Sequence, residues 1–153
     1  MQISGLLSVD SLKGDSDEDT ELLRGMANDA RSFLTQFDWC KAIVEFYFGI
    51  GTGGIVAVFL ARILGAEEDV DEWLWVVIGD LPPAYLVTDT VPSPAAALRA
   101  YIEQMREWVT AARLGRPVQE IIPVNVPPTP ENANSLNSRL DFIERELLPS
   151  FES

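Results

Sequence analysis

The sequence has no histidine and a single cysteine, Cys40, among its 153 residues. Histidine is the commonest general base and the commonest ligand of transition metals, so its absence weighs against both kinds of site. One cysteine cannot form a disulfide framework, and without histidine to activate it we expect Cys40 to be a buried packing thiol. We therefore predict no catalytic residue, no cofactor and no bound metal, and expect a binding protein in preference to an enzyme.

Basic residues are also scarce, with 11 Lys and Arg against 24 Asp and Glu and a formal net charge of −13. The average field of such a protein repels nucleic-acid phosphates and anionic lipid surfaces, and it attracts positively charged surfaces. We expect neither a nucleic-acid nor a membrane partner, and a basic protein is the candidate partner.

The longest uncharged run is too short to cross a membrane as a helix. Sixteen residues lie between Glu45 and Arg62, whereas about 18–20 apolar residues are needed, and the run contains four glycines. The first residues lack the basic, apolar and small-residue regions of an export signal. We therefore expect a cytoplasmic protein.

The stretch DEWLWVVIGDLPPAYLVTD, residues 71–89, is typical of two strands around a sharp turn. Its aromatic and β-branched residues suit a buried sheet surface. Pro82 and Pro83 cannot donate ladder hydrogen bonds, so pairing should stop there and resume at Tyr85. Apolar runs in residues 39–50 and 55–64, separated by glycines, predict further strands, and both faces of the second run are apolar.

Three helices are predicted around these strands. Apolar residues recur at helical spacing over residues 21–37. Ser93 with Pro94, and Thr129 with Pro130, are helix-start signals, for helices running to about Leu114 and to Pro149. The prediction is an α+β fold: an antiparallel sheet of three to four strands with one N-terminal and two C-terminal helices. Residues 1–20 should be a flexible acidic segment, and residues 21–150 a single domain.

Two patterns mimic known ligand sites. The G-I-G-T-G-G stretch from Gly49 to Gly54 satisfies the dinucleotide fingerprint G-x-G-x-x-G. The apolar residues on every side of the following run favour a glycine-rich hairpin instead, and a nucleotide-binding protein is the alternative. Asp15, Asp17 and Asp19 resemble the start of a calcium loop, but the glycine and the final glutamate of such a loop are absent, which favours a solvated acidic run.

Four residues of the 71–89 stretch are the candidate binding residues. Asp80, close to Tyr85, ends an apolar strand; it either holds its own turn through backbone hydrogen bonds or serves as the centre of a carboxylate enzyme. Trp73 and Trp75 share one face of their strand. They form either a binding surface or part of the core, and the core is the more common place for such residues.

The stretch W-L-W-V-V-I-G-D-L-P-P-A-Y-L is followed by P-x-x-A-L-R-A-Y-I-E-Q-M-R-E-W over residues 94–108. This pair resembles a bacterial domain family of unknown function that carries a W-x-V-x-G-D-L-P-x-x-Y strand-turn-strand motif. The resemblance implies a bacterial origin and brings no activity with it.

Together these patterns predict a protein-interaction or regulatory module, with an immunity-like neutraliser of a basic toxin as one form. A second expectation is a homodimer. The strands predicted over residues 55–64 and 72–79 are apolar on both faces, and three amphipathic helices cannot cover both. We expect Val58 and Leu60 near the centre of the dimer interface.

Overall fold

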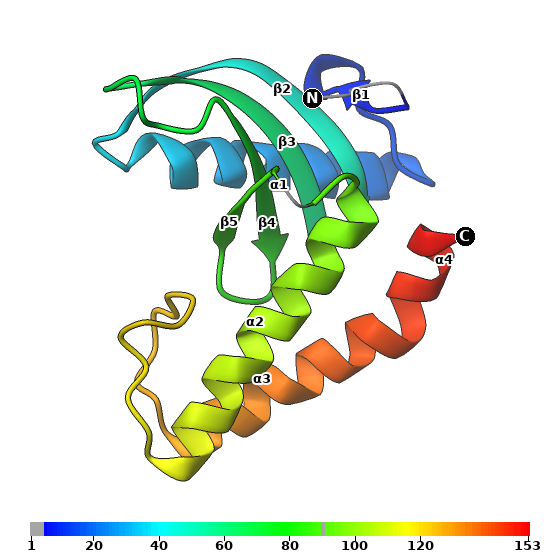
Figure 1. Ribbon diagram of the computed structural model, residues 1–153. Helices are drawn as coiled ribbons and strands as arrows, with labels where there is room; N and C mark the ends of the chain where they lie inside the picture. The colour runs from blue at the N-terminus through cyan, green and yellow to red at the C-terminus, as the bar shows by residue number, and fades with distance from the viewer. Residues whose placement is uncertain (1–4, 90) are drawn as a thin grey trace. The chain divides into compact units, whose positions relative to one another are not determined.

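The computed structural model of the chain describes residues 5–89 and 91–153 (Figure 1). The chain divides into two compact units, residues 1–97 and 98–153. The first unit contains the sheet and the first helix, and the second contains helices and a long loop. The α+β class and the antiparallel sheet are confirmed. The single domain expected over residues 21–150 stays a prediction.

The first unit is an antiparallel meander of five strands with one long helix. The elements are β1 (Leu7–Ser8), a 3₁₀ helix (Val9–Ser11), α1 (Asp17–Thr35), β2 (Cys40–Thr52), β3 (Val56–Gly65), β4 (Trp73–Gly79) and β5 (Ala84–Val87). The strands lie in sequence order, β1-β2-β3-β4-β5. The fifth strand, beyond the three to four expected, is the two-residue β1, which is too short to leave a periodic signal. Tyr47 and Phe48 of β2 are its partners.

Helix α1 packs on one face of this sheet (Figure 1). Alternate residues of the strands point toward it, because successive side chains of a strand face opposite ways. The core formed there includes Phe59, Ala61, Ile63, Leu74, Val76 and Ile78 from the strands and Leu23, Ala27, Ala30 and Leu34 from α1. Leu12 belongs to the same core and is 1% exposed. The described part of residues 1–20 thus contains regular structure and a core residue, which the expectation of a loose acidic segment missed.

The opposite face of the sheet is also buried. Val58, Leu60, Trp75 and Val77 are all 0% exposed. Both faces of β3 are therefore covered over residues 56–61, as the apolar residues of that part predict. Val58 and Leu60, expected at the centre of a homodimer, are among these buried residues. Dimer formation itself stays a prediction.

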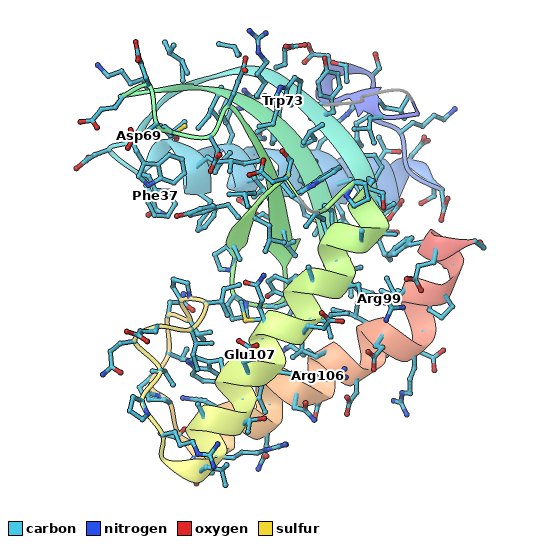
Figure 2. The ribbon with its side chains drawn as sticks, in the orientation of Figure 1. Phe37, Asp69, Trp73, Arg99, Arg106 and Glu107 are labelled. Carbon is cyan, nitrogen blue, oxygen red and sulfur yellow. The ribbon has the colours of Figure 1, made fainter. Side chains whose placement is uncertain are left out.

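The second unit consists of helices joined by an irregular segment. Helix α2 (Pro94–Leu114) begins at the end of the first unit, and α3 (Pro130–Phe142), a π-helical segment (Ile143–Leu147) and α4 (Leu148–Glu152) follow. Arg106 on α2 pairs with Asp141 and Glu144, each at 2.8 Å, and Arg99 pairs with Glu152 at 2.8 Å (Figure 2). The last helix was expected to continue regularly to Pro149. The structure instead has the π-helical segment immediately before α4, which contains Pro149. Proline has no N–H and its ring crowds the carbonyl four residues earlier, so the regular α-helical hydrogen bonds cannot continue through this turn.

Candidate functional site

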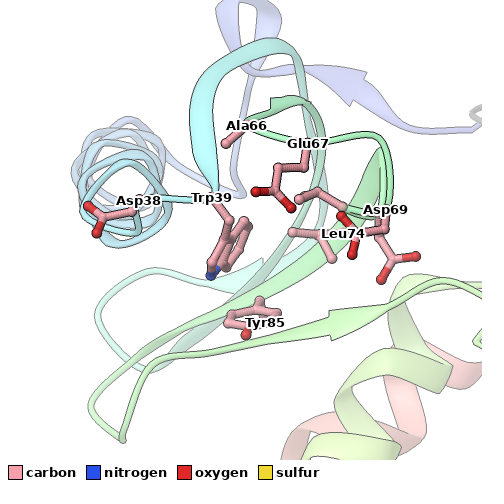
Figure 3. Close-up of a pocket in the computed structure, with 9 residues that line it drawn as sticks. Asp38, Trp39, Ala66, Glu67, Asp69, Leu74 and Tyr85 are labelled. Carbon is pink, nitrogen blue, oxygen red and sulfur yellow. The ribbon is translucent and has the colours of Figure 1, made fainter.

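A cavity of about 520 Å³ opens beside the loop between β3 and β4 (Figure 3). It lies entirely within the first unit. We call it the aromatic pocket, and its lining residues are Asp38, Trp39, Ala66, Glu67, Asp69, Val70, Asp71, Leu74 and Tyr85. The volume is in the range of sites that accept a small molecule or the side chain of a partner.

Short backbone contacts fix the walls of the aromatic pocket. Helix α1 ends at Thr35, and the chain turns through residues 36–39 into β2, with the Cys40 N–H donating to the Phe37 carbonyl at 3.1 Å. The N–H of Ala66 donates to the Trp39 carbonyl at 2.9 Å. This bond ties the start of the β3–β4 loop to the wall residue, so the loop and Trp39 hold their places together.

Four aromatic rings gather at this wall. Phe37 and Trp39 are stacked, with centroids 4.9 Å apart and planes 15° apart. Tyr85 meets Trp39 at 5.0 Å and 65°, and meets Phe37 at 5.5 Å and 78°. Phe33 of α1 completes the group, with its centroid 5.3 Å from that of Phe37. All four rings are at most partly buried, and Tyr85 is 39% exposed. Phe33 and Trp39 also pack against the buried core, so the cluster lies at the edge of the core with Tyr85 exposed to solvent.

The polar lining of the aromatic pocket carries one sign of charge. Its carboxylates are Asp38, Glu67, Asp69 and Asp71, and none of the nine lining residues is Lys or Arg. In Figure 3 the Glu67 carboxylate turns back toward the Trp39 ring, whereas that of Asp38 points away. The arrangement presents aromatic surface and negative charge to the same space, which suits a cation.

Of the four candidate binding residues, only Tyr85 lines the aromatic pocket. Trp73 stacks with Tyr47, with centroids 6.5 Å apart, and Trp75 is fully buried and donates its indole N–H to the Val91 carbonyl at 3.0 Å. Asp80 is exposed at the turn after β4, where its backbone N–H donates to the Ile55 carbonyl at 3.0 Å. The turn therefore separates Asp80 from the Tyr85 wall.

Sequence reasoning missed Trp39 and Glu67 as site residues. Both lie at element ends, and the hydrogen bond between the Ala66 N–H and the Trp39 carbonyl joins segments that are far apart in the chain. No local pattern encodes that contact.

The G-x-G-x-x-G stretch is a hairpin, as the apolar pattern predicted. The strand β3 follows Gly54, where the dinucleotide fingerprint requires a helix. The two turn amides are already occupied within the chain. Gly53 donates its N–H to Asp19 Oδ1 at 2.7 Å, and Gly54 donates to Met26 Sδ at 3.4 Å. The anion at this turn is thus the carboxylate of Asp19, which also accepts from the Asp15 N–H at 2.9 Å.

One further polar network lies on the sheet. Arg62 contacts Glu45 and Glu72, each at 2.6 Å, and the Tyr47 hydroxyl donates to Glu45 at 2.6 Å. The Tyr47 hydrogen bond, followed by that of Arg62, lowers the pKa of Glu45. These groups satisfy one another, so the network serves as structure.

Cys40 is 5% exposed, and burial raises the pKa of its thiol. Such a thiol is a poor nucleophile, and the expectation of a buried packing residue is confirmed.

Comparisons with models of protein families, with curated proteins and with solved structures found no match. Across residues 5–89 and 91–153, no three His, Cys, Asp or Glu side chains are grouped to hold a metal ion. Within the same ranges, every helix is too short or too polar to cross a membrane. The resemblance to a bacterial domain family and the cytoplasmic location stay predictions.

Proposed function

We propose that this chain is an interaction module that binds a basic protein partner, and that the partner docks at the aromatic pocket. The observation that carries the proposal is a partly exposed aromatic cluster beside a cavity that is lined by Glu67, Asp69 and Asp71 and has no basic lining residue. Tryptophan and tyrosine dominate the binding energy of protein interfaces, because they bury large areas with little loss of conformational freedom. The carboxylates add specificity for positive charge.

The charge of the whole chain supports the same partner. A net charge of −13 raises the rate at which a basic surface encounters the protein, and salt should reduce that rate. Long-range attraction alone would bind any polycation at any acidic face. The aromatic pocket gives the proposal a location, and the location separates specific docking from general attraction. Inhibition of the partner, the immunity-like form, stays a prediction.

The test compares two double variants with equal charge. Glu67→Gln with Asp69→Asn removes two carboxylates from the aromatic pocket, and Glu107→Gln with Glu120→Gln removes two exposed carboxylates from the second unit. Each pair changes the net charge from −13 to −11, since −13 + 2 = −11. The probe is a fluorescent peptide with four arginines spaced by glycine and serine, and binding is read from polarisation.

The proposal predicts that the pocket pair weakens binding of this peptide by about tenfold, a difference of about 1.4 kcal/mol. The pair in the second unit should change it by about twofold or less, because exposed charges that do not contact the peptide are screened by salt. Equal losses in both pairs would mean that the peptide responds to net charge alone, and that the aromatic pocket is not its site.

A further inference from the structure

The geometry of the aromatic cluster leaves one face of Trp39 uncovered by its ring neighbours. Phe37 stacks on the other face, 4.9 Å away. A ring on the far face of Trp39 would lie roughly two stacking distances from Phe37, yet Tyr85 is only 5.5 Å from Phe37 and 5.0 Å from Trp39. Tyr85 therefore stands beside the stacked pair. Within the described part of the chain, no aromatic ring covers the far face of the indole. Trp39 also packs against the buried core, and the part of its side chain that lines the cavity is the surface a ligand can reach.

Tyr85 and Phe37 hold this indole in place. Phe37 packs edge-on against Phe33, with ring centroids 5.3 Å apart and planes at 89°, and the Phe37 backbone N–H donates to the Leu34 carbonyl at 3.2 Å. The Trp39 backbone is held on the other side by Ala66. A ligand that stacks on the indole thus meets a surface already in its bound orientation, which reduces the ordering cost of binding.

The side chain that fits this surface is planar, cationic and able to donate two parallel hydrogen bonds. Tryptophan is the best cation–π partner, and a guanidinium stacks flat on it. The Glu67 carboxylate turns toward the same ring (Figure 3) and can accept from both nitrogens of a guanidinium fork. An ammonium is a compact, strongly hydrated charge that can use the carboxylate but stacks poorly.

We infer that the aromatic pocket binds an arginine side chain of the basic partner, stacked on the part of Trp39 that lines the cavity, with Glu67 as its counter-ion. The inference rests on the proposed function, because it names the group by which the partner is recognised. Tyr85 forms the side wall, and the lining residues Asp69 and Asp71 attract the basic residues that flank the arginine. Recognition would then combine one stacked anchor with a surrounding of weaker charge contacts, the usual anatomy of a hot spot.

The experiment uses four capped peptides of sequence Gly-Ser-Xaa-Ser-Gly, in which Xaa is arginine, lysine, trimethyl-lysine or citrulline. Dissociation constants are measured by NMR titration of the full chain. Citrulline keeps the planar shape and loses the charge, whereas trimethyl-lysine keeps the charge and loses the plane and the donors. We expect arginine to bind about tenfold more tightly than either citrulline or lysine.

Two tryptophan variants locate the contact. Trp39→Leu should weaken the arginine peptide by about tenfold, and Trp73→Leu, which removes the partly buried ring that stacks on Tyr47, should leave its affinity within about twofold. Trp39→Phe keeps an aromatic face and should recover part of the affinity, which separates loss of stacking from loss of fold. Amide spectra of each variant check that the sheet is intact.

The outcomes distinguish the inference from the proposed function. If basic peptides bind but arginine has no advantage, or Trp39→Leu binds as well as the unmodified chain, then the arginine anchor is wrong and the basic partner stands. Preference for trimethyl-lysine would also overturn the inference, in favour of a quaternary ammonium ligand. If neither these peptides nor the four-arginine peptide bind, the proposed function fails as well.

Discussion

Replacing Asp19 with alanine should destabilise the first unit far more than its position near the start of a surface helix suggests. Its carboxylate accepts from the N–H of Gly53 at 2.7 Å and from that of Asp15 at 2.9 Å. It therefore links the β2–β3 hairpin to the segment that enters α1. Hydrogen bonds to a charged group contribute about 1.5–3 kcal/mol each, less where water reaches them, so losing both should cost about 2–4 kcal/mol. For a chain of this length that lowers the melting temperature by roughly 5–15 °C.

The matched control is Asp17→Ala, which removes the same charge from the first turn of α1 at an exposed position. Its effect should be limited to the helix-dipole contribution, about 0.3–1 kcal/mol. Thermal unfolding followed by circular dichroism measures both variants. Hydrogen exchange at the Gly53 amide provides a local readout and should accelerate only in Asp19→Ala. Equal destabilisation by the two variants, with unchanged exchange at Gly53, would refute the assignment of Asp19 as the anion of the hairpin.

Three further predictions follow from single contacts. Gly79→Ala should destabilise the protein by several kcal/mol in urea unfolding, because the new Cβ would overlap the Ile55 carbonyl oxygen and lie 2.9 Å from Val56 Cα. Gly25→Ala in α1, where the new Cβ meets nothing within 4 Å, should instead stabilise the protein by about 0.5–1 kcal/mol. Similar effects at both sites would contradict this. Tyr47→Phe should raise the pKa of Glu45 toward its ordinary value in a carbon-detected NMR titration. The lowered pKa stabilises the fold above the ordinary carboxyl range, and this stabilisation is lost as the pH falls through the folded-state pKa, so the variant should show less acid sensitivity; an unchanged Glu45 titration would reject the role of Tyr47. Light scattering at physiological salt should report twice the chain mass of 16.9 kDa if the predicted homodimer forms, and a 16.9 kDa particle would reject it.

The strands and helices were predictable because their signals are local. The apolar runs at residues 56–61 of β3 and 74–78 of β4 are buried on both faces. The start of α2 lies at Pro94, where Ser93 Oγ accepts from the Ala96 N–H at 3.1 Å. The turn after Gly79 was also predictable, but the need for glycine there comes from the close approach of the Ile55 backbone in the β2–β3 turn, a contact between distant segments. Periodicity and caps contain this kind of information.

The aromatic pocket was not predictable, because it depends on packing between distant segments. Tyr85 was a candidate through its strand, but its ring partners Phe33, Phe37 and Trp39 come from the end of a helix and the turn after it. The same limit explains the glycine motif. Its spacing permits a phosphate loop, and only the long-range bond from Gly53 to Asp19 reveals that the chain supplies its own anion there.

The most direct test of a cation-binding aromatic pocket is the indole N–H spectrum of the four tryptophans during titration with the single-arginine peptide. Trp39 lines the cavity, whereas Trp73 lies with Tyr47 and Trp75 donates its indole N–H to the Val91 carbonyl. We expect a saturable chemical-shift change of the Trp39 indole N–H resonance and of the amide resonances of the β3–β4 loop, whereas the indole resonances of the other tryptophans should not shift. Saturable shifts centred on a different tryptophan, or a spectrum that does not respond to arginine at all, would contradict it.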